Sequence, residues 1–71
     1  MESTRERFRD DVASPREVAE ALRVSEEALK QLRYRKRGPK YVKVGSKIFY
    51  RWSDVERYFD KNAVDPSEAR P

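Results

Sequence analysis

The chain has 71 residues and carries 17 Lys and Arg against 13 Asp and Glu, which gives a net charge of +4. This length allows one small domain, and the absence of Cys and His excludes a disulfide framework, a Cys/His zinc site and His-dependent nucleophilic catalysis. We therefore expect neither an enzyme nor a bound cofactor. No apolar run approaches the roughly 18 residues that span a bilayer, and no signal peptide is recognisable, so we expect a soluble, cytoplasmic protein.

The charge is unevenly distributed along the chain. Nine basic and no acidic residues lie between Lys30 and Arg51, whereas the other 49 residues carry eight basic and thirteen acidic side chains. Apolar and aromatic residues alternate with the basic ones, so this segment is expected to be folded and to bind a polyanion such as nucleic acid. A solvated basic face without a partner, or one that docks an acidic protein, remains an alternative. A membrane surface is disfavoured because it requires a basic amphipathic helix.

The first predicted element is a helix within residues 3–13. Ser3 and Glu6 have the spacing of a capping box, and Phe8 and Val12 follow on one helical face. Two apolar side chains bury little surface, so this helix would need a partner surface in the domain or on another subunit.

Two short helices separated by about three residues are predicted next. Ser14, Pro15 and Glu17 form a strong helix start that includes a capping box, and Ser25 is expected to cap the second helix. The spacing of the two helices is that of a helix-turn-helix motif. Three apolar residues of the second helix are expected to face the core: Ala28, Leu29 and Leu32.

A basic β-hairpin follows, after a Gly-Pro pair that ends the second helical region. A two-residue turn would place Val44 opposite Lys47 and would mix apolar and charged groups on one face. A three-residue loop over residues 45–47 instead pairs Val44 with Ile48 and Val42 with Tyr50. It leaves one apolar face, so we predict this register. In this register the side chains of three residues point outward: Lys43, Phe49 and Arg51.

A third capping box, Ser53–Glu56, predicts the closing helix. Val55, Tyr58 and Phe59 would form its inner face, and Trp52 would cover the core just before the cap. We interpret these aromatic residues as packing residues.

The predicted elements together make an α+β winged helix-turn-helix, with a hairpin wing and a closing helix. The domain is expected over residues 14–59. An N-terminal helical extension over residues 1–13 would precede it, and a flexible C-terminal tail over residues 60–71 would follow it.

The region from Ser14 to Phe59 resembles the excisionase and MerR-type winged helix-turn-helix proteins. The pieces that carry the resemblance are Glu17-Val18-Ala19, Val24-Ser25, Val44-Gly45 and Ser53–Glu56. The sequence departs from the common pattern at Phe49, where a basic or polar residue is more usual.

This resemblance implies sequence-specific binding to duplex DNA, with the second helix in the major groove and the wing in the adjacent minor groove. Small stand-alone members resemble phage excisionases, also called recombination directionality factors. Those proteins bind repeated sites in an attachment region, bend the DNA and direct a tyrosine integrase toward excision. The implied partners are therefore attachment-site DNA, a tyrosine integrase and further copies of the chain on the nucleoid of a bacterial host. Small prophage transcriptional regulators share the arrangement, and the sequence does not separate the two roles.

The second helix supplies the candidates for reading bases. Gln31 could pair with adenine and Glu27 could accept from cytosine, although each could instead be a surface residue, and Glu27 would also stabilise the helix dipole. Tyr34 could alternatively pack against the wing. The candidate residues for the major groove are Glu27, Lys30, Gln31, Arg33 and Tyr34.

Three further groups of candidates complete the predicted site. The residues expected to contact phosphates are Arg16, Ser25, Arg35, Lys36 and Arg37. The residues expected at the wing and the minor groove are Lys43, Gly45, Ser46 and Lys47. The candidates for self-association on DNA are Phe8, Val12 and Phe49.

Overall fold

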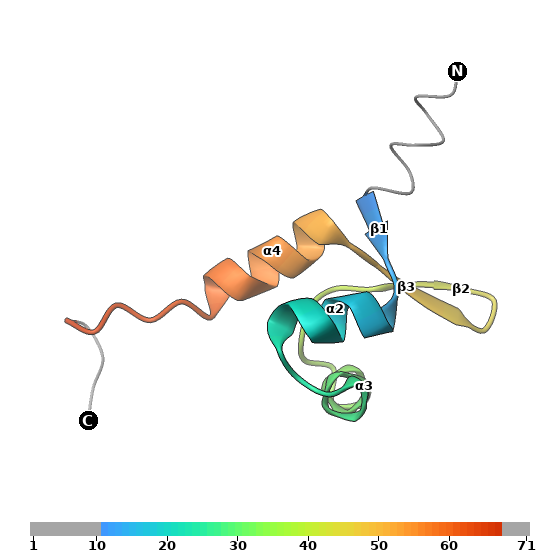
Figure 1. Ribbon diagram of the computed structural model, residues 1–71, viewed down its shortest axis with the longest axis horizontal. Helices are drawn as coiled ribbons and strands as arrows, with labels where there is room; N and C mark the ends of the chain where they lie inside the picture. Colours follow the sequence, from blue (N-terminus) through green and yellow to red (C-terminus); the bar gives the residue numbers. More distant parts are fainter. Residues whose placement is uncertain (1–10, 68–71) are drawn as a thin grey trace, which may run out of the picture.

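The computed structural model describes residues 11–67 and confirms the winged helix-turn-helix (Figure 1). Its elements in chain order are β1 (Val12–Ala13), α2 (Pro15–Leu22), α3 (Glu26–Tyr34), β2 (Val42–Val44), β3 (Lys47–Arg51) and α4 (Trp52–Lys61). The wing, formed by β2, β3 and the turn between them, projects on the side of the molecule opposite to α4 (Figure 1).

The starts of α2 and α3 are fixed by the predicted serine caps. The Ser14 hydroxyl accepts from the Glu17 N–H at 3.1 Å, and the Glu17 carboxylate accepts from the Ser14 N–H at 2.8 Å, which completes the capping box. The Ser25 hydroxyl accepts from the Ala28 N–H at 3.0 Å. Both helices therefore begin where the sequence indicates.

The turn between α2 and α3 depends on a left-handed residue. Arg23 ends α2 with φ of 60°, and the next residue, Val24, donates its N–H to the Ala19 carbonyl at 2.9 Å. This arrangement satisfies carbonyls that the end of a helix would otherwise leave free, and it redirects the chain from α2 into α3 within three residues.

The sheet has three antiparallel strands in the order β1-β3-β2, so the hairpin gains a third strand. Val12 pairs with Arg51 and Ala13 pairs with Tyr50. The helix predicted over residues 3–13 is therefore wrong at its C-terminal end. Pairing with β3 buries Ala13, which a helix with two apolar side chains could not do. Residues 1–10, including Phe8, lie outside the described part of the chain.

The predicted register of the hairpin is also wrong. The turn has two residues, and Val44 lies opposite Lys47 while Val42 lies opposite Phe49. Gly45 takes φ of 63° at the first turn position, which suits a two-residue hairpin turn. The wing extends from the body of the domain, and Val44 is 60% exposed, so its tip does not require a purely apolar face.

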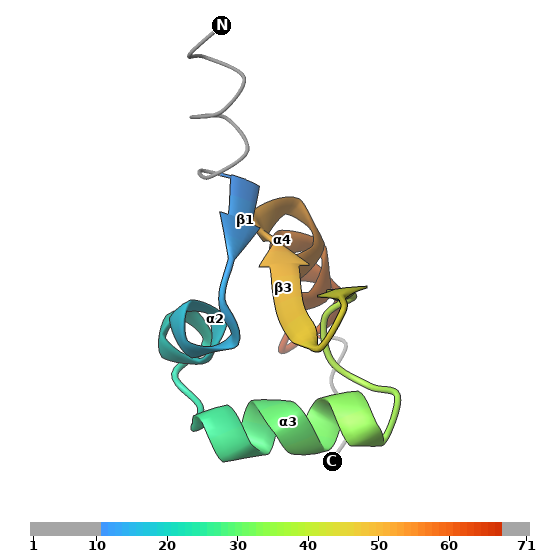
Figure 2. The ribbon, with the colours of Figure 1, turned by 90° about the vertical axis from the view of Figure 1, so that its right-hand side faces the viewer.

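The core lies between the helices and the inner face of β3. Side chains alternate along a strand, so Tyr50 points into the core with Ile48, while Phe49 lies on the outer face. Figure 2 shows β3 in front of α4, beside α2 and above α3. The buried hydrophobic residues of the described chain are Ala13, Val18, Ala19, Leu29, Tyr50 and Val55.

Three further packing predictions are corrected by the structure. Leu29 and Leu32 define the inner face of α3. Ala28 is exposed because it precedes Leu29 by one residue, which rotates it about 100° around the helix away from that face. Phe59 is 64% exposed because the C-terminal half of α4 extends beyond the sheet (Figure 1). Ser53 is not a cap: α4 starts directly from β3, with Arg51 as its N-cap and no side-chain hydrogen bond there.

Candidate nucleic-acid interface

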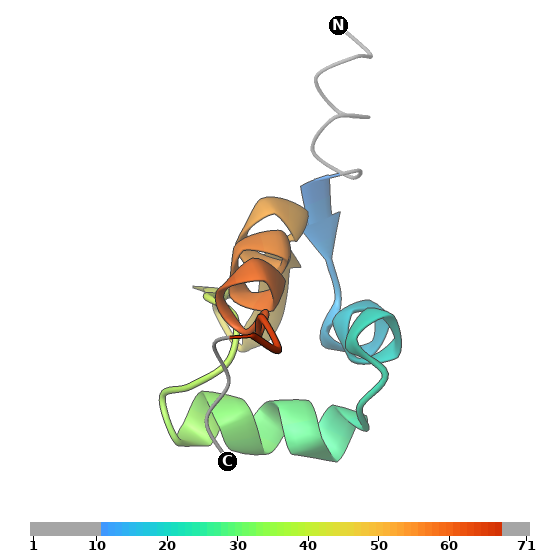
Figure 3. The ribbon, with the colours of Figure 1, turned by 90° about the vertical axis from the view of Figure 1, so that its left-hand side faces the viewer.

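Helix α3 runs along the edge of the molecule that lies farthest from β1. Figures 2 and 3, seen from opposite sides, both show this position. Four of the five side chains predicted to enter the major groove are exposed: Glu27, Lys30, Gln31 and Tyr34. The inner face of α3 holds the buried Leu29, so the helix presents a polar and basic surface outward.

The exposed side chains of α3 make only weak contacts with one another. The Gln31 amide donates to Glu27 Oε2 at 3.5 Å, and Lys30 Nζ lies 5.6 Å from the centre of the Tyr34 ring. Tyr34 is 68% exposed and lies beside Lys30 rather than against the wing. Contacts of this kind contribute a few tenths of a kcal/mol, about 0.2–0.5 each, so a ligand could replace them at little cost.

Arg33, the fifth predicted groove residue, connects α3 to the wing. Its Nη1 donates to the Tyr50 hydroxyl at 3.0 Å, and its guanidinium carbon lies 5.9 Å from the centre of the Tyr41 ring. The ring centres of Tyr41 and Tyr50 are 6.2 Å apart, and the planes of the two rings are inclined by 55°. Arg33 therefore fixes the position of the wing relative to α3. No local pattern predicts this contact, because the two partners lie on separate elements.

The basic cluster Arg35–Arg37 is held rigidly at the end of α3. Lys36 adopts φ of 58°, and the Arg37 N–H donates to the Leu32 carbonyl at 2.7 Å, in the pattern of a Schellman motif. Gly38 follows with φ of 84°, and a Cβ there would lie 3.0 Å from Leu32. The three basic side chains are all exposed, so they extend the positive surface beyond the last turn of the helix.

The predicted wing residues lie at and next to the tip. Lys43, Gly45, Ser46 and Lys47 are all exposed. A Cβ at Gly45 would meet nothing within 4 Å, so the tip is open to a close approach by another molecule.

Two predicted phosphate contacts lie near helix starts. Arg16 is exposed in the first turn of α2 and forms an ion pair with Glu20 at 3.8 Å. The Ser25 hydroxyl lies at the start of α3, where it already accepts a backbone N–H.

The sheet brings together two candidates for self-association. Val12 pairs with Arg51, and Phe49 precedes that arginine by two residues, so both side chains belong to the outer face of the sheet. Both residues are half-buried. Phe8 lies outside the described residues.

Asp54 is a structural residue that the sequence did not single out. Its carboxylate is buried, and it accepts from Arg51 Nη1 at 3.3 Å and from Arg57 Nη1 at 3.1 Å. The two ion pairs join the end of β3 to α4. The available signal in the sequence for these ion pairs is the position of Arg51 and Arg57, three residues before and three residues after Asp54.

Residues 11–67 contain neither a metal site nor a membrane span. No group of three or more His, Cys, Asp or Glu side chains there could hold a metal ion, and no helix there could cross a membrane.

Comparison with known proteins gives one match. The family described as helix-turn-helix domain matches residues 14–63, a range that contains α2, α3, the wing and α4. No curated protein and no solved structure matches the chain.

Proposed function

The chain belongs to the helix-turn-helix domain family, whose members bind DNA, and we propose that it is an excisionase that directs site-specific recombination. In this role it binds repeated sites in a phage attachment region, bends the DNA and favours excision by a tyrosine integrase. It performs no chemistry on the DNA itself.

The distribution of charge carries the DNA-binding part of the proposal. The acid-free segment from Lys30 to Arg51 begins on α3 and ends with β3, so its nine positive charges fall on the helix, its C-terminal loop and the wing. The helix and the wing are the two elements that a winged helix-turn-helix protein places against DNA. Phosphate neutralisation by such a surface supplies most of the affinity that does not depend on sequence.

The exposed face of α3 supports the assignment of base contacts. Gln31 and Glu27 lie four residues apart on one face of the helix, and both are exposed. With α3 in the major groove, Gln31 pairs with adenine and Glu27 accepts from cytosine. Lys47 and the open tip at Gly45 enter the adjacent minor groove.

Self-association on DNA follows from the small size of the interface. A single module of this kind buries about 600–1,000 Å² of protein surface, which limits the specificity of one copy. We propose that neighbouring copies bind cooperatively to repeated sites through Phe8, Val12 and Phe49. The shared position of Val12 and Phe49 on the outer face of the sheet supports this surface.

The first experiment is a gel shift on attachment-site DNA with random duplex as the competitor, at physiological salt. A specific shifted species is expected, and Gln31→Ala should reduce the preference for the site more than the affinity for random duplex. The absence of a specific species with the wild-type protein would refute the proposal.

The second experiment separates the excisionase from a transcriptional regulator. Excision of an integrated cassette by the cognate tyrosine integrase is measured with and without the protein. A strong increase in excision is expected. Excision that does not respond to the protein, together with specific DNA binding, would favour the regulator.

A further inference from the structure

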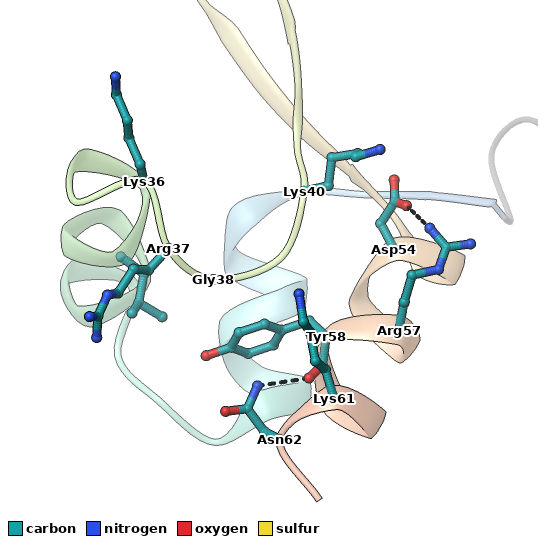
Figure 4. Close-up of a pocket in the computed structure, with 10 residues that line it drawn as sticks. Lys36, Arg37, Gly38, Lys40, Asp54, Arg57, Tyr58, Lys61 and Asn62 are labelled. Atoms are coloured by element: carbon teal, nitrogen blue, oxygen red, sulfur yellow. Dashed lines mark hydrogen bonds and ion pairs between the residues drawn. The ribbon is translucent and has the colours of Figure 1, made fainter.

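We propose that the DNA-binding surface continues past α3, across the following loop and onto α4, and that Lys40 of the loop and Arg57 and Lys61 of α4 bind backbone phosphates of the duplex. This inference rests on the proposed DNA binding and adds residues from an element that the groove contacts do not use. It concerns a hollow of about 630 Å³ between the loop after α3 and α4 (Figure 4). This basic hollow is named for the lysines and arginines that line it.

The composition of the basic hollow indicates an anionic ligand. Five basic residues line it, three from the loop after α3 and two from α4: Lys36, Arg37, Lys40, Arg57 and Lys61. Its one acidic residue, Asp54, is buried and already paired with two arginines. The surface that a ligand would meet is therefore strongly positive.

Most of these positive charges have no counterion in the described chain. The ion pairs found among residues 11–67 do not include Lys36, Arg37, Lys40 or Lys61. Like charges that line one hollow repel one another, and an anion bound among them relieves this repulsion. Arg57 differs, because it also holds Asp54 at 3.1 Å.

The basic hollow is continuous with the predicted DNA interface. A second hollow adjoins it and is lined by Arg33 and Tyr41 at the base of the wing. The two hollows share Lys36, Arg37, Gly38 and Lys40. Figure 4 shows Lys36 and Arg37 on the α3 side of Gly38, and Lys40, Arg57 and Lys61 on its α4 side.

This continuity identifies the anion as DNA backbone. Lys36 and Arg37 immediately follow the helix that is placed in the major groove, so a strand that passes the end of α3 meets them first. The same strand then reaches Lys40 and Lys61 if the duplex stays close to, or bends toward, α4. Lysine binds phosphate as a point charge and needs no special geometry, which suits an open, shallow surface.

The test measures the salt dependence of binding to a labelled random-sequence duplex of about 30 base pairs, close to three helical turns. The full chain is compared with Lys40→Gln/Lys61→Gln and with the matched control Lys40→Arg/Lys61→Arg, which keeps both charges. Arg57 is left unchanged because its loss would remove one of the two ion pairs of the buried Asp54 and would destabilise the fold. Circular dichroism verifies that each variant is folded.

Each phosphate contact makes the slope of log K against log salt steeper by about 0.9. The double variant Lys40→Gln/Lys61→Gln should therefore reduce the magnitude of this negative slope by about 1.8. The arginine pair should keep the wild-type slope. An unchanged slope in the glutamine pair, while Lys47→Gln lowers it, would overturn this inference and leave the proposed function intact. A wild-type slope near zero would instead refute DNA binding itself, and the inference with it.

Discussion

Replacing Tyr50 with Phe removes one hydroxyl from the junction of α3 and the wing and leaves the aromatic ring in place. Tyr50 is fully buried, and its hydroxyl accepts from Arg33 Nη1 at 3.0 Å. A hydrogen bond to a charged group contributes about 1.5–3 kcal/mol. Arg33 is only half-buried, so water can replace part of the lost contact. We therefore expect Tyr50→Phe to lower the free energy of unfolding by about 1 kcal/mol.

The assay is urea unfolding, monitored by the fluorescence of Trp52, the single tryptophan. Tyr41→Phe is the matched control, because no hydrogen bond of the Tyr41 hydroxyl occurs among the residues that the structure describes. The control should stay within about 0.5 kcal/mol of the wild type. A double-mutant cycle with Arg33→Gln should return a coupling energy of about 1 kcal/mol. Equal stability of Tyr50→Phe and Tyr41→Phe would refute the reasoning.

Three further predictions concern the core, the wing and self-association. Leu29→Ala should cost about 2–5 kcal/mol in urea unfolding, because Leu29 is fully buried; a loss below 1 kcal/mol, roughly that of a half-exposed site, would contradict the packing. Gly45→Ala should cost about 1 kcal/mol through backbone strain alone at φ of 63°, since its Cβ meets no neighbour, and unchanged thermal unfolding would argue against this turn. Phe8→Ala should reduce cooperative binding to paired sites more than affinity for a single site in a gel shift, and an equal loss of both would count against self-association. Deleting residues 1–13 is a poorer test, because it also removes β1 and the buried Ala13.

The order of the elements could be predicted because local signals determine it. The capping box at Ser14 and the cap at Ser25 depend on residues three positions apart, and both hydrogen bonds form as the sequence indicates. The polar outer face of α3 follows from helical periodicity, which explains why Gln31 and Lys30 are exposed.

The failures share a different physical cause, which is contact between distant parts of the chain. The pairing of β1 with β3 has no local signature, so local patterns place Val12 in a helix. The predicted register rests on an apolar face, but a wing that projects into solvent does not need one, and Val44 is exposed. The contact of Arg33 with Tyr50 and the burial of Asp54 likewise depend on how separate elements meet.

The pairing of Ala13 with Tyr50 has a consequence for how the chain folds. Strand β3 lies between β1 and β2, and Tyr50 completes the core that α2 and α3 begin. Contacts between residues far apart in sequence form late, after the cost of closing the intervening loop. On the ribosome, α2 and α3 emerge before Tyr50, and they lack this aromatic ring until β3 follows. The helix-turn-helix should therefore become protease-resistant only once Arg51 has emerged from the ribosome.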